Sequence, residues 1–286
     1  MAAYILSYGL ADSQKLESLR AKPEFRKATR NMLLSSLSVA QALAPLQDFI
    51  LQKAAKAFGQ DCGLVLGSGH GELEVTLDFL KTLAETQVAR PILFQNSLHH
   101  STAGFMSLQL NIQGPAMTVS QQFLSGENAL DMGMLLVSQK LCRFCLVTGV
   151  DSHVPELIPG AAALIHNEGA ASLLLTDEEG VRQSGLKPIA ELLSLEYFSN
   201  LSNLPNLSIL PKNQSQEQGF TQAHSTFKPS YESDAIEHLI AALQPSADFA
   251  QGTSRKFREE EEISELRLTK FNQSGSLIRW RRVVGE

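Results

Sequence analysis

The stretch that decides the fold of this chain runs from Gly114 to Leu130 and reads Gly-Pro-Ala-Met-Thr-Val-Ser-Gln-Gln-Phe-Leu-Ser-Gly-Glu-Asn-Ala-Leu. Pro115 has a fixed backbone dihedral and no N–H donor, so it suits the start of a strand. An apolar, partly β-branched run follows and predicts a short buried strand: Ala116, Met117, Thr118 and Val119. From Ser125, a plausible cap, apolar residues recur at helical spacing. The sequence therefore predicts a strand, a bend and a helix.

The bend near Gln121 to Leu124 is where many α/β enzymes place a nucleophile, because helix N-terminal amides stabilise an anion. The stretch resembles the active-site elbow of β-ketoacyl synthases in the thiolase superfamily. In that family a Gly-Pro strand leads into Thr/Ala-Cys-Ser/Thr-Ser-Gly. Laid on the pattern without gaps, this chain matches at Gly114, Pro115, Ser125 and Gly126. Phe123 stands at the cysteine position.

A phenyl ring cannot attack a thioester, so this resemblance implies a degenerate elbow with no catalytic residue. The degenerate elbow comprises Gln122, Phe123, Ser125 and Gly126. An ordinary α/β core turn is the alternative for this stretch taken alone. The remainder of the chain favours the family.

Length, composition and net charge limit the classes of protein to which this chain can belong. The 286 residues can bury one large core or two smaller ones, and the contents of 43% hydrophobic and 19% charged residues are ordinary for a globular protein. The net charge of −6 gives no support for nucleic-acid binding. Three cysteines are too few for a disulfide scaffold. The first residues do not show a basic region followed by an apolar one, and no long apolar span follows, so we expect no leader peptide and no membrane span. We expect a cytoplasmic protein that binds no nucleic acid and no membrane.

A glycine-rich turn follows the predicted strand Cys62–Leu66 and reads Gly67-Ser68-Gly69-His70-Gly71-Glu72. As a dinucleotide-binding motif it is weak, because no acidic residue ends a second strand at the expected distance. We expect no cofactor. Ketosynthases carry a similar Gly-Ser-Gly-x-Gly beside the acyl pocket. The next helix, predicted to begin at Gly71, is amphipathic through Leu73, Leu77, Leu80 and Leu83.

The segment Ala89–Phe105 resembles ketosynthase-like N-terminal domains of aryl-polyene-type clusters, in its Arg-Pro, Phe-x-Asn-Ser and Ala-Gly pattern. It contains the doublet His99-His100. Neighbouring residues on a helix point about 100° apart, so the two imidazoles cannot readily serve one site. Metal binding needs further ligands, and no cysteine or carboxylate lies at a useful spacing. We therefore expect helix-packing histidines and no metal site.

The resemblance runs from about residue 24 to 176 and ends in Asn167–Leu175, which is similar to the Gly-Glu-Gly-Ala strand of the family. It implies an α/β, thiolase-like (αβαβα-type) fold whose N-terminal half is retained and whose C-terminal half is truncated. We divide the chain into residues 1–190, the ketosynthase-like half, and residues 191–286, a shortened extension. In the extension we expect an irregular segment 200–230, a helix 232–243 and a terminal hairpin of 265–271 with 276–284.

Two departures from the family coincide: the cysteine is missing, and so is the half that would supply two catalytic histidines. Neither His224 nor His238 lies in a matching motif. In type II polyketide synthases, a catalytic ketosynthase pairs with a homologous chain-length factor that lacks the cysteine. The resemblance thus implies a non-catalytic partner that forms a heterodimer through the strand Ala116–Val119. It would meet the acyl carrier protein through that complex, and its acyl-tunnel candidates are His70, Leu73, Leu77 and Phe94.

Three other functions compete with this hypothesis. Ketosynthase-like domains with Gln at the elbow can decarboxylate malonyl carriers, but Gln121 and Gln122 both precede the cysteine position. A serine hydrolase using Ser125 would need Gly-x-Ser-x-Gly, which is absent. The chain could also be a scaffold that docks enzymes without shaping the product.

A group of basic residues near the start of a predicted helix could contact an acidic carrier protein: Arg26, Lys27 and Arg30. A solvated helix face is the simpler interpretation.

Overall fold

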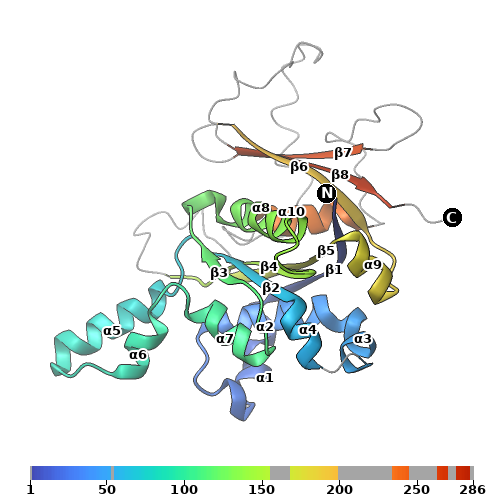
Figure 1. The fold of residues 1–286 in the computed structure, drawn as a ribbon. Helices are drawn as coiled ribbons and strands as arrows, with labels where there is room; N and C mark the ends of the chain where they lie inside the picture. Colours follow the sequence, from blue (N-terminus) through green and yellow to red (C-terminus); the bar gives the residue numbers. More distant parts are fainter. Residues whose placement is uncertain are drawn as a thin grey trace, which may run out of the picture.

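The computed structural model describes residues 2–52, 55–154, 168–198, 234–244, 263–269 and 275–283. Within these ranges, eight strands form one sheet in the order β3-β2-β4-β5-β1-β6-β8-β7 (Figure 1). The strands are β1 (Ala3–Asp12), β2 (Cys62–Gly67), β3 (Ala116–Val119), β4 (Phe144–Asp151), β5 (Gly169–Thr176), β6 (Ala190–Phe198), β7 (Ile263–Thr269) and β8 (Gly275–Arg282). The α/β class predicted from the sequence is confirmed.

Ten α-helices are described along the same ranges. They are α1 (Leu16–Arg20), α2 (Arg30–Leu43), α3 (Gln47–Gln52), α4 (Ala55–Asp61), α5 (Leu73–Thr86), α6 (Pro91–Asn96), α7 (Ser101–Gln109), α8 (Ser125–Ser138), α9 (Glu178–Ser184) and α10 (Asp234–Leu243). Thr29 caps α2 by accepting a hydrogen bond from the Met32 amide, and α2 ends at Leu43, just before Pro45. Proline cannot continue an α-helix without losing a hydrogen bond, which explains the end of α2 at this point.

Three strands at the centre of the sheet are buried on both faces. β2 is parallel to β3 and β4, while β5 runs antiparallel to β4, and every residue of β2, β4 and β5 is buried. Because strand side chains alternate between faces, these strands contribute side chains to two hydrophobic cores, one on each face of the sheet. Leu64 and Phe144 belong to the core under α2, whereas Val65 and Val147 belong to the core under α8.

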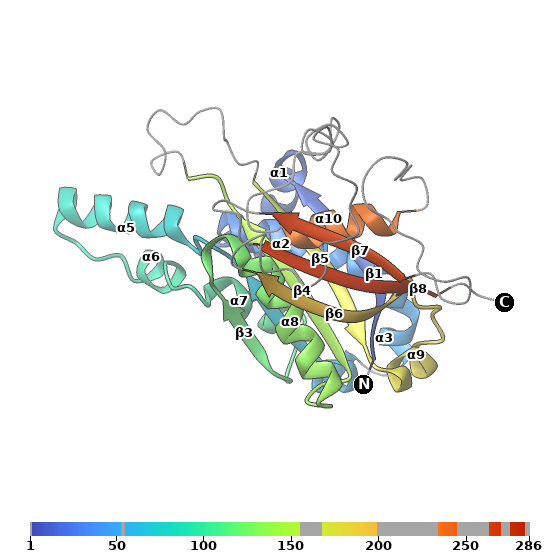
Figure 2. The ribbon, with the colours of Figure 1, turned by 90° about the horizontal axis from the view of Figure 1, so that it is seen from above.

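The elements stack as helix, sheet, helix and sheet (Figures 1 and 2). Helices α1, α2, α3, α4 and α7 cover one face of β3-β2-β4-β5-β1, and α8 and α10 cover the other. Strands β6, β8 and β7 lie beyond α8 and α10, after β6 has joined β1 through three residue pairs. Leu192, Ile278 and Trp280 point inward to the core that α8 and α10 share.

The outer face of β6 and β8 carries charged side chains. Arg281 forms an ion pair with Glu191 directly across the two strands, and Arg279 forms one with Glu196. Among the described helices, none covers this face. Cross-strand ion pairs therefore cover the outer face of the fourth layer. In an αβαβα architecture, a further layer of helices covers the corresponding face.

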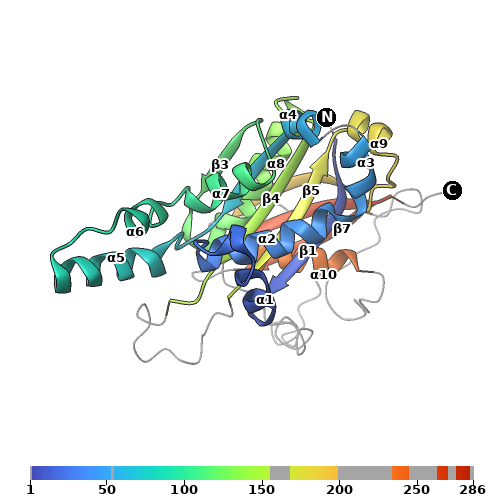
Figure 3. The same cartoon turned by 90° about the horizontal axis from the view of Figure 1, so that it is seen from below.

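Helices α5 and α6 project from the body as an arm (Figures 1 and 3). Neither helix has a buried residue, although α5 is amphipathic as predicted. Helix α5 begins at Leu73, two residues after the predicted start at Gly71, because Gly71 has a left-handed φ of 56°. Phe79 and Phe94 pack against each other between the two helices, with ring centroids 5.7 Å apart and ring planes tilted by 54°.

The strand predicted at 116–119 is confirmed as β3, but the expectation that it is buried is wrong. β3 is the last strand of the sheet, with only β2 beside it, so Ala116 is exposed and the other three residues are half-buried. The helix expected at 232–243 is α10, and β7 pairs with β8 as the terminal hairpin. The segment expected at 200–230, which includes His224, lies outside the described residues, as does the side chain of His238.

Helix α8 approaches the sheet closely at Gly133, and this contact generates a stability prediction. A methyl group on Gly133 would lie 2.3 Å from Val147 Cγ2, so Gly133→Ala should lower the free energy of unfolding by about 1–3 kcal/mol. Gly104→Ala on α7 is the matched control: no atom lies within 4 Å, so the change should raise stability by about 0.5–1 kcal/mol. Urea unfolding followed by circular dichroism measures both. Equal stability of Gly133→Ala and wild type would contradict the close packing.

Candidate functional site

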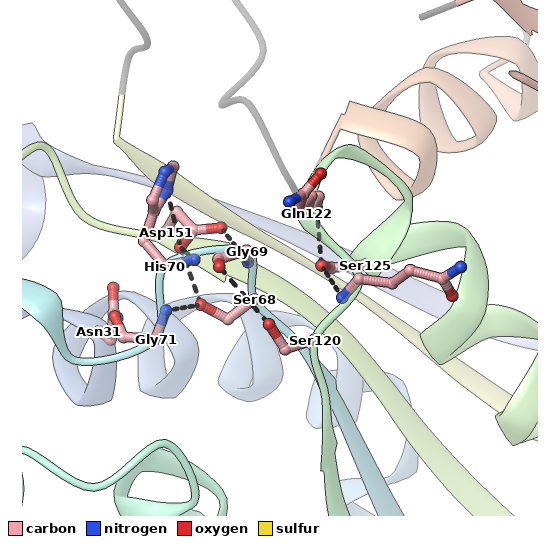
Figure 4. Close-up of polar contacts among 10 residues, drawn as sticks. Asn31, Ser68, Gly69, His70, Gly71, Ser120, Gln122, Ser125 and Asp151 are labelled. Atoms are coloured by element: carbon pink, nitrogen blue, oxygen red, sulfur yellow. Dashed lines mark hydrogen bonds and ion pairs between the residues drawn. The ribbon is translucent and has the colours of Figure 1, made fainter. Parts of the chain in front are cut away.

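The candidate site lies where the carboxyl ends of three parallel strands meet. β2 is followed by the turn Ser68–Glu72, β3 by the elbow Ser120–Leu124, and β4 ends at Asp151. The parallel registers of β2 with β3 and with β4 bring these three ends together at one edge of the sheet (Figure 4). Such an edge is the usual place for a ligand in an α/β sheet.

Asp151 holds the glycine-rich turn in place. Its Oδ1 accepts hydrogen bonds from Ser68 Oγ at 2.8 Å and from the His70 amide at 3.2 Å, and its Oδ2 accepts from the Gly69 amide at 3.1 Å. Ser68 Oγ in turn accepts from the Gly71 amide at 2.8 Å. A buried carboxylate thus receives three donors, and they fix the backbone of the turn (Figure 4).

The elbow is closed by Ser125. Its hydroxyl accepts from the Gln121 amide at 2.9 Å and donates to the Gln122 carbonyl at 2.7 Å (Figure 4). A 3₁₀ turn, Gln122–Leu124, connects this point to α8. Because both bonds go to backbone, the Ser125 hydroxyl stabilises the bend and is not presented as a nucleophile.

The strained residue of the elbow is Gln122. It has a left-handed φ of 48°, which is unusual for a residue with a side chain, and its side chain is exposed. In strand-to-helix elbows, the nucleophile stands on such a strained bend. The gapless match puts the cysteine position at Phe123, whose backbone lies in the 3₁₀ turn and whose side chain is outside the described set. Backbone conformation therefore marks Gln122, one residue earlier, as the apex.

The tunnel candidates occupy the turn and the arm that begins at it. His70 lies on the turn with Nδ1 3.9 Å from Asp151 Oδ1, while Leu73 and Leu77 are half-buried on α5. Phe94 is 55% exposed on α6. The structure therefore does not bring the four residues into one cluster; His70 borders the elbow, and the other three line the arm.

Sequence reasoning missed two acidic residues of this region. Asp151 was not singled out from the sequence, although a polar residue at the carboxyl end of a buried parallel strand is a signal for a site. Glu72, at the start of α5, is also buried; burial raises its pKa to about 7, while hydrogen bonds from Thr102 and Thr29 act in the opposite direction. Its position directly after the glycine run was the available signal.

The histidine doublet and the cysteines contribute no metal centre to the described ranges, in which no group of three or more potential ligands is found. His99 and His100 are exposed and lie in the turn before α7 rather than on the predicted helix. Cys142 and Cys145 are buried in the core beside α8. No described helix is long and apolar enough to cross a membrane.

Comparison with solved structures defines the class of fold. The ishigamide ketosynthase/chain length factor matches with a TM-score of 0.65 and 14% identity, covering 99% of this chain and 100% of that chain. The AntDE:AntF complex, a type II polyketide synthase acyl-carrier protein with its ketosynthase bound to the hexaketide, matches at 0.71 and 12%, covering 99% of each chain. The ketosynthase ApeO with its chain length factor ApeC from Xenorhabdus doucetiae matches at 0.55 and 14%, covering 99% and 100%. The fold is thiolase-like, as in these ketosynthases.

The family follows from the sequence match. The model of the β-ketoacyl synthase N-terminal domain matches residues 33–228, which is more than half of the 286 residues. The chain belongs to the β-ketoacyl synthase N-terminal domain family. Among curated proteins, no sequence relative is found. The family resemblance expected from the elbow, the glycine-rich turn and the segment Ala89–Phe105 is confirmed.

The geometry of the elbow predicts a difference in reactivity between two cysteine variants. Gln122→Cys places a thiol at the N-terminal end of α8, and Gln139→Cys places one at its C-terminal end, both at exposed positions. The helix dipole stabilises a thiolate at the first site and opposes it at the second, so the alkylation midpoint should be lower for Gln122→Cys by about one pH unit. Iodoacetamide labelling followed by mass spectrometry measures this, with little background from the three buried cysteines. Equal midpoints would mean that the elbow does not point its apex toward the helix axis.

Proposed function

We propose that the chain is a non-catalytic, chain-length-factor-like partner of a catalytic β-ketoacyl synthase. The two would form a heterodimer that shapes the acyl or polyene tunnel while the chain grows on a carrier protein in the cytoplasm. The observation that supports this best is the elbow: the strand, the strained bend and the buried helix are all kept, yet its apex is a glutamine. A carboxamide does not form an acyl-enzyme, and neither does the phenyl ring of Phe123.

The free edge of β3 supports heterodimer formation. In a parallel pair, alternate residues turn both backbone groups to the same neighbour. Here the Pro115 carbonyl accepts from the Leu64 amide in β2, and the Val119 carbonyl accepts from the Ser68 amide directly after β2. The N–H and C=O groups of Ala116 and Thr118 therefore face outward. Helices α7 and α8 lie on either side of β3 and carry the exposed Leu108 and Leu135 (Figure 1). An open strand edge flanked by exposed leucines is a surface that a partner's sheet can cover.

Charge supports contact with a carrier protein, which is acidic in this family. Arg26 and Lys27 are exposed next to the start of α2 and make no ion pair among the described residues. Arg30, the third basic residue of the predicted group, instead forms an ion pair with Glu168. The basic surface proposed to meet the carrier is therefore smaller than the sequence indicated. The solved relative AntDE:AntF, whose name includes an acyl-carrier protein, makes this partner a reasonable choice.

The product is proposed from resemblance: an aryl-polyene-type or fatty acyl chain. The solved complex of ApeO with its chain length factor ApeC and the ishigamide ketosynthase/chain length factor share the fold of this chain. The three free, buried thiols agree with a reducing compartment such as the cytoplasm.

Heterodimer formation is tested on co-expression with a full-length catalytic ketosynthase. Native mass spectrometry should find a one-to-one complex. Thr118→Pro removes an outward N–H and should weaken association by about tenfold or more, because a backbone hydrogen bond contributes about 1 kcal/mol and the ring also obstructs pairing. Thr118→Val keeps the N–H and removes a hydroxyl that has no partner within the described chain, so it should bind like wild type.

The result that would remove the basis of the proposal is a stable monomer that binds no ketosynthase. Equal binding by Thr118→Pro and Thr118→Val would instead exclude β3 as the pairing edge and leave heterodimer formation to another surface.

Length control is proposed to lie at the base of the arm. We expect Ala at His70, Leu73 or Leu77 to lengthen the product in at least one variant while the heterodimer persists. Truncating a leucine in a filled core to alanine lowers the free energy of unfolding by about 2–5 kcal/mol. Because α5 has no buried residue, Leu73→Ala and Leu77→Ala should destabilise the chain far less. Leu130→Ala, in the buried face of α8, is the control that should destabilise the chain. Product lengths are read by mass spectrometry.

The proposal of a gate at this place fails if all three variants either lose the heterodimer or leave the product distribution unchanged. The scaffold alternative would then be favoured, since a scaffold docks the synthase without setting product length.

A further inference from the structure

The arm is held to the body at its root rather than along its length. Helices α5 and α6 contain no buried residue, so little packing fixes their direction. The chain leaves the body at Gly71 and Glu72 and returns through Leu98 to Thr102. The two sides of the root are tied by Thr76 Oγ1, which donates to the Ser97 carbonyl at 3.3 Å. Whatever fixes these few residues fixes the direction of the arm.

One carboxyl oxygen joins three helices at this root. Glu72 Oε1 accepts hydrogen bonds from Thr29 Oγ1 at 2.9 Å and from Thr102 Oγ1. Thr29 caps α2, Thr102 lies in the first turn of α7, and Glu72 itself precedes the first residue of α5. Glu72 is only 3% exposed. The body and both ends of the arm therefore converge on a single side chain.

The residue before Glu72 is fixed independently. Asn31 Nδ2 donates to the Gly71 carbonyl at 2.6 Å, and the His99 imidazole packs so closely that a methyl group on Gly71 would lie 2.2 Å from His99 Nδ1. Gly71 also has the left-handed φ that only glycine adopts without strain. The arm thus leaves the body through a turn whose backbone has one available path, and Glu72 is the first side chain after it.

A buried carboxyl in this position needs a reason beyond stability, because desolvation disfavours its charged form and an apolar residue would pack at no such cost. The elbow does not explain it, since the hydrogen bonds of the Glu72 carboxyl group come from Thr29 and Thr102 and not from residues of the elbow. The two hydrogen bonds instead indicate that the Glu72 carboxyl group acts as a joint, which connects α5 to α2 and α7.

We propose that Glu72 is a positioning residue whose carboxyl group sets the direction in which the α5–α6 arm leaves the body. By fixing the first turn of α5, it would also place Leu73 and Leu77 against a partner. The second statement rests on the proposed function, whereas the first concerns the chain alone.

The stability of the docked arm should depend on pH. Titratable and charged groups come from the elements packed around this joint: Glu74 on α5, Asp151 on β4, Arg30 at the start of α2 with its partner Glu168, His70 on the turn and His99 before α7. Burial is the largest influence, and it raises the pKa of Glu72 from 4.5 to about 7, with Glu74 and Asp151 acting in the same direction. The docked arm therefore favours the neutral carboxyl.

The sign of the effect follows from linkage. A carboxyl whose pKa is higher in the docked state than in the open state stabilises the docked state fully at acidic pH, and this contribution is lost as pH rises through about 7. For a shift of this size, the ratio of docked to open arm should fall by about tenfold between pH 6 and pH 8. Glu72→Gln carries a permanently neutral side chain that can accept the same two hydroxyl bonds, so it should show no such fall.

Hydrogen exchange of the full chain tests the joint. Peptides covering residues 73–98 are compared between pH 6 and pH 8, after correction for intrinsic exchange, with β4 peptides as an internal reference. Wild type should lose about tenfold protection in the arm, and Glu72→Gln should keep the same protection at both pH values. Glu85→Gln, the matched control, removes an exposed acidic group near the C-terminal end of the same helix and should retain the wild-type slope. Thr102→Val should lower arm protection already at pH 6 while leaving β4 unchanged.

Two outcomes would overturn the proposal: a wild-type slope in Glu72→Gln, or arm protection in Thr102→Val equal to wild type. Thr102→Val keeps the test decisive if Glu72→Gln does not fold. If the exchange results hold but product length and heterodimer formation do not respond to Thr102→Val, the joint stands and the proposed role of the arm in the partner complex is wrong.

Discussion

The close approach of α8 to the sheet is the constraint on which the structure depends. A methyl group on Gly67 would lie 2.4 Å from the Ser125 carbonyl oxygen, and one on Gly133 would meet Val147. With glycine at both ends of the contact, α8 lies directly on β2 and β4, and its opposite side remains free to pack under β6 and β8. The elbow must then turn within a few residues between β3 and α8, and this tight path explains the left-handed backbone at Gln122. Layering and elbow geometry thus have one cause.

The polar interactions of the site serve the same geometry. Asp151 fixes the glycine-rich turn through two amides and a hydroxyl, and Ser125 closes the elbow through backbone groups. In each case a side chain that might have carried chemistry instead holds the backbone. Polar groups also have a structural role on the outer face of β6 and β8. Ion pairs between these strands cover a face that helices cover in an αβαβα architecture. These features make the body of the protein well fixed, and they leave β3 and the arm as its open surfaces.

The sequence predicted those parts that local patterns determine. The change from strand to helical spacing located β3 and α8. The burial of β3 was predicted wrongly because four apolar residues look alike in a central and in an edge strand. The same limit applies to α5: an apolar stripe predicts an amphipathic helix, but not whether its partner is the core of the same chain or another molecule. The left-handed backbone at Gln122 was not foreseen, since a residue count carries no information on φ. Glu72 and Asp151 were missed because their roles depend on contacts with Thr29, Thr102 and Ser68, which lie far away in sequence.

The exposed edge of β3 has a consequence for how such a protein can change over evolution. Its outward hydrogen-bonding groups belong to the backbone of Ala116 and Thr118, and every residue except proline offers the same N–H and C=O. An interface built on that edge can persist while the side chains drift, which suits a fold shared at 12–14% identity. An edge of this kind cannot tell one homologous partner from another. Fidelity between paralogues would have to reside in the side chains of the arm, which are free of core packing and can diverge without loss of the fold.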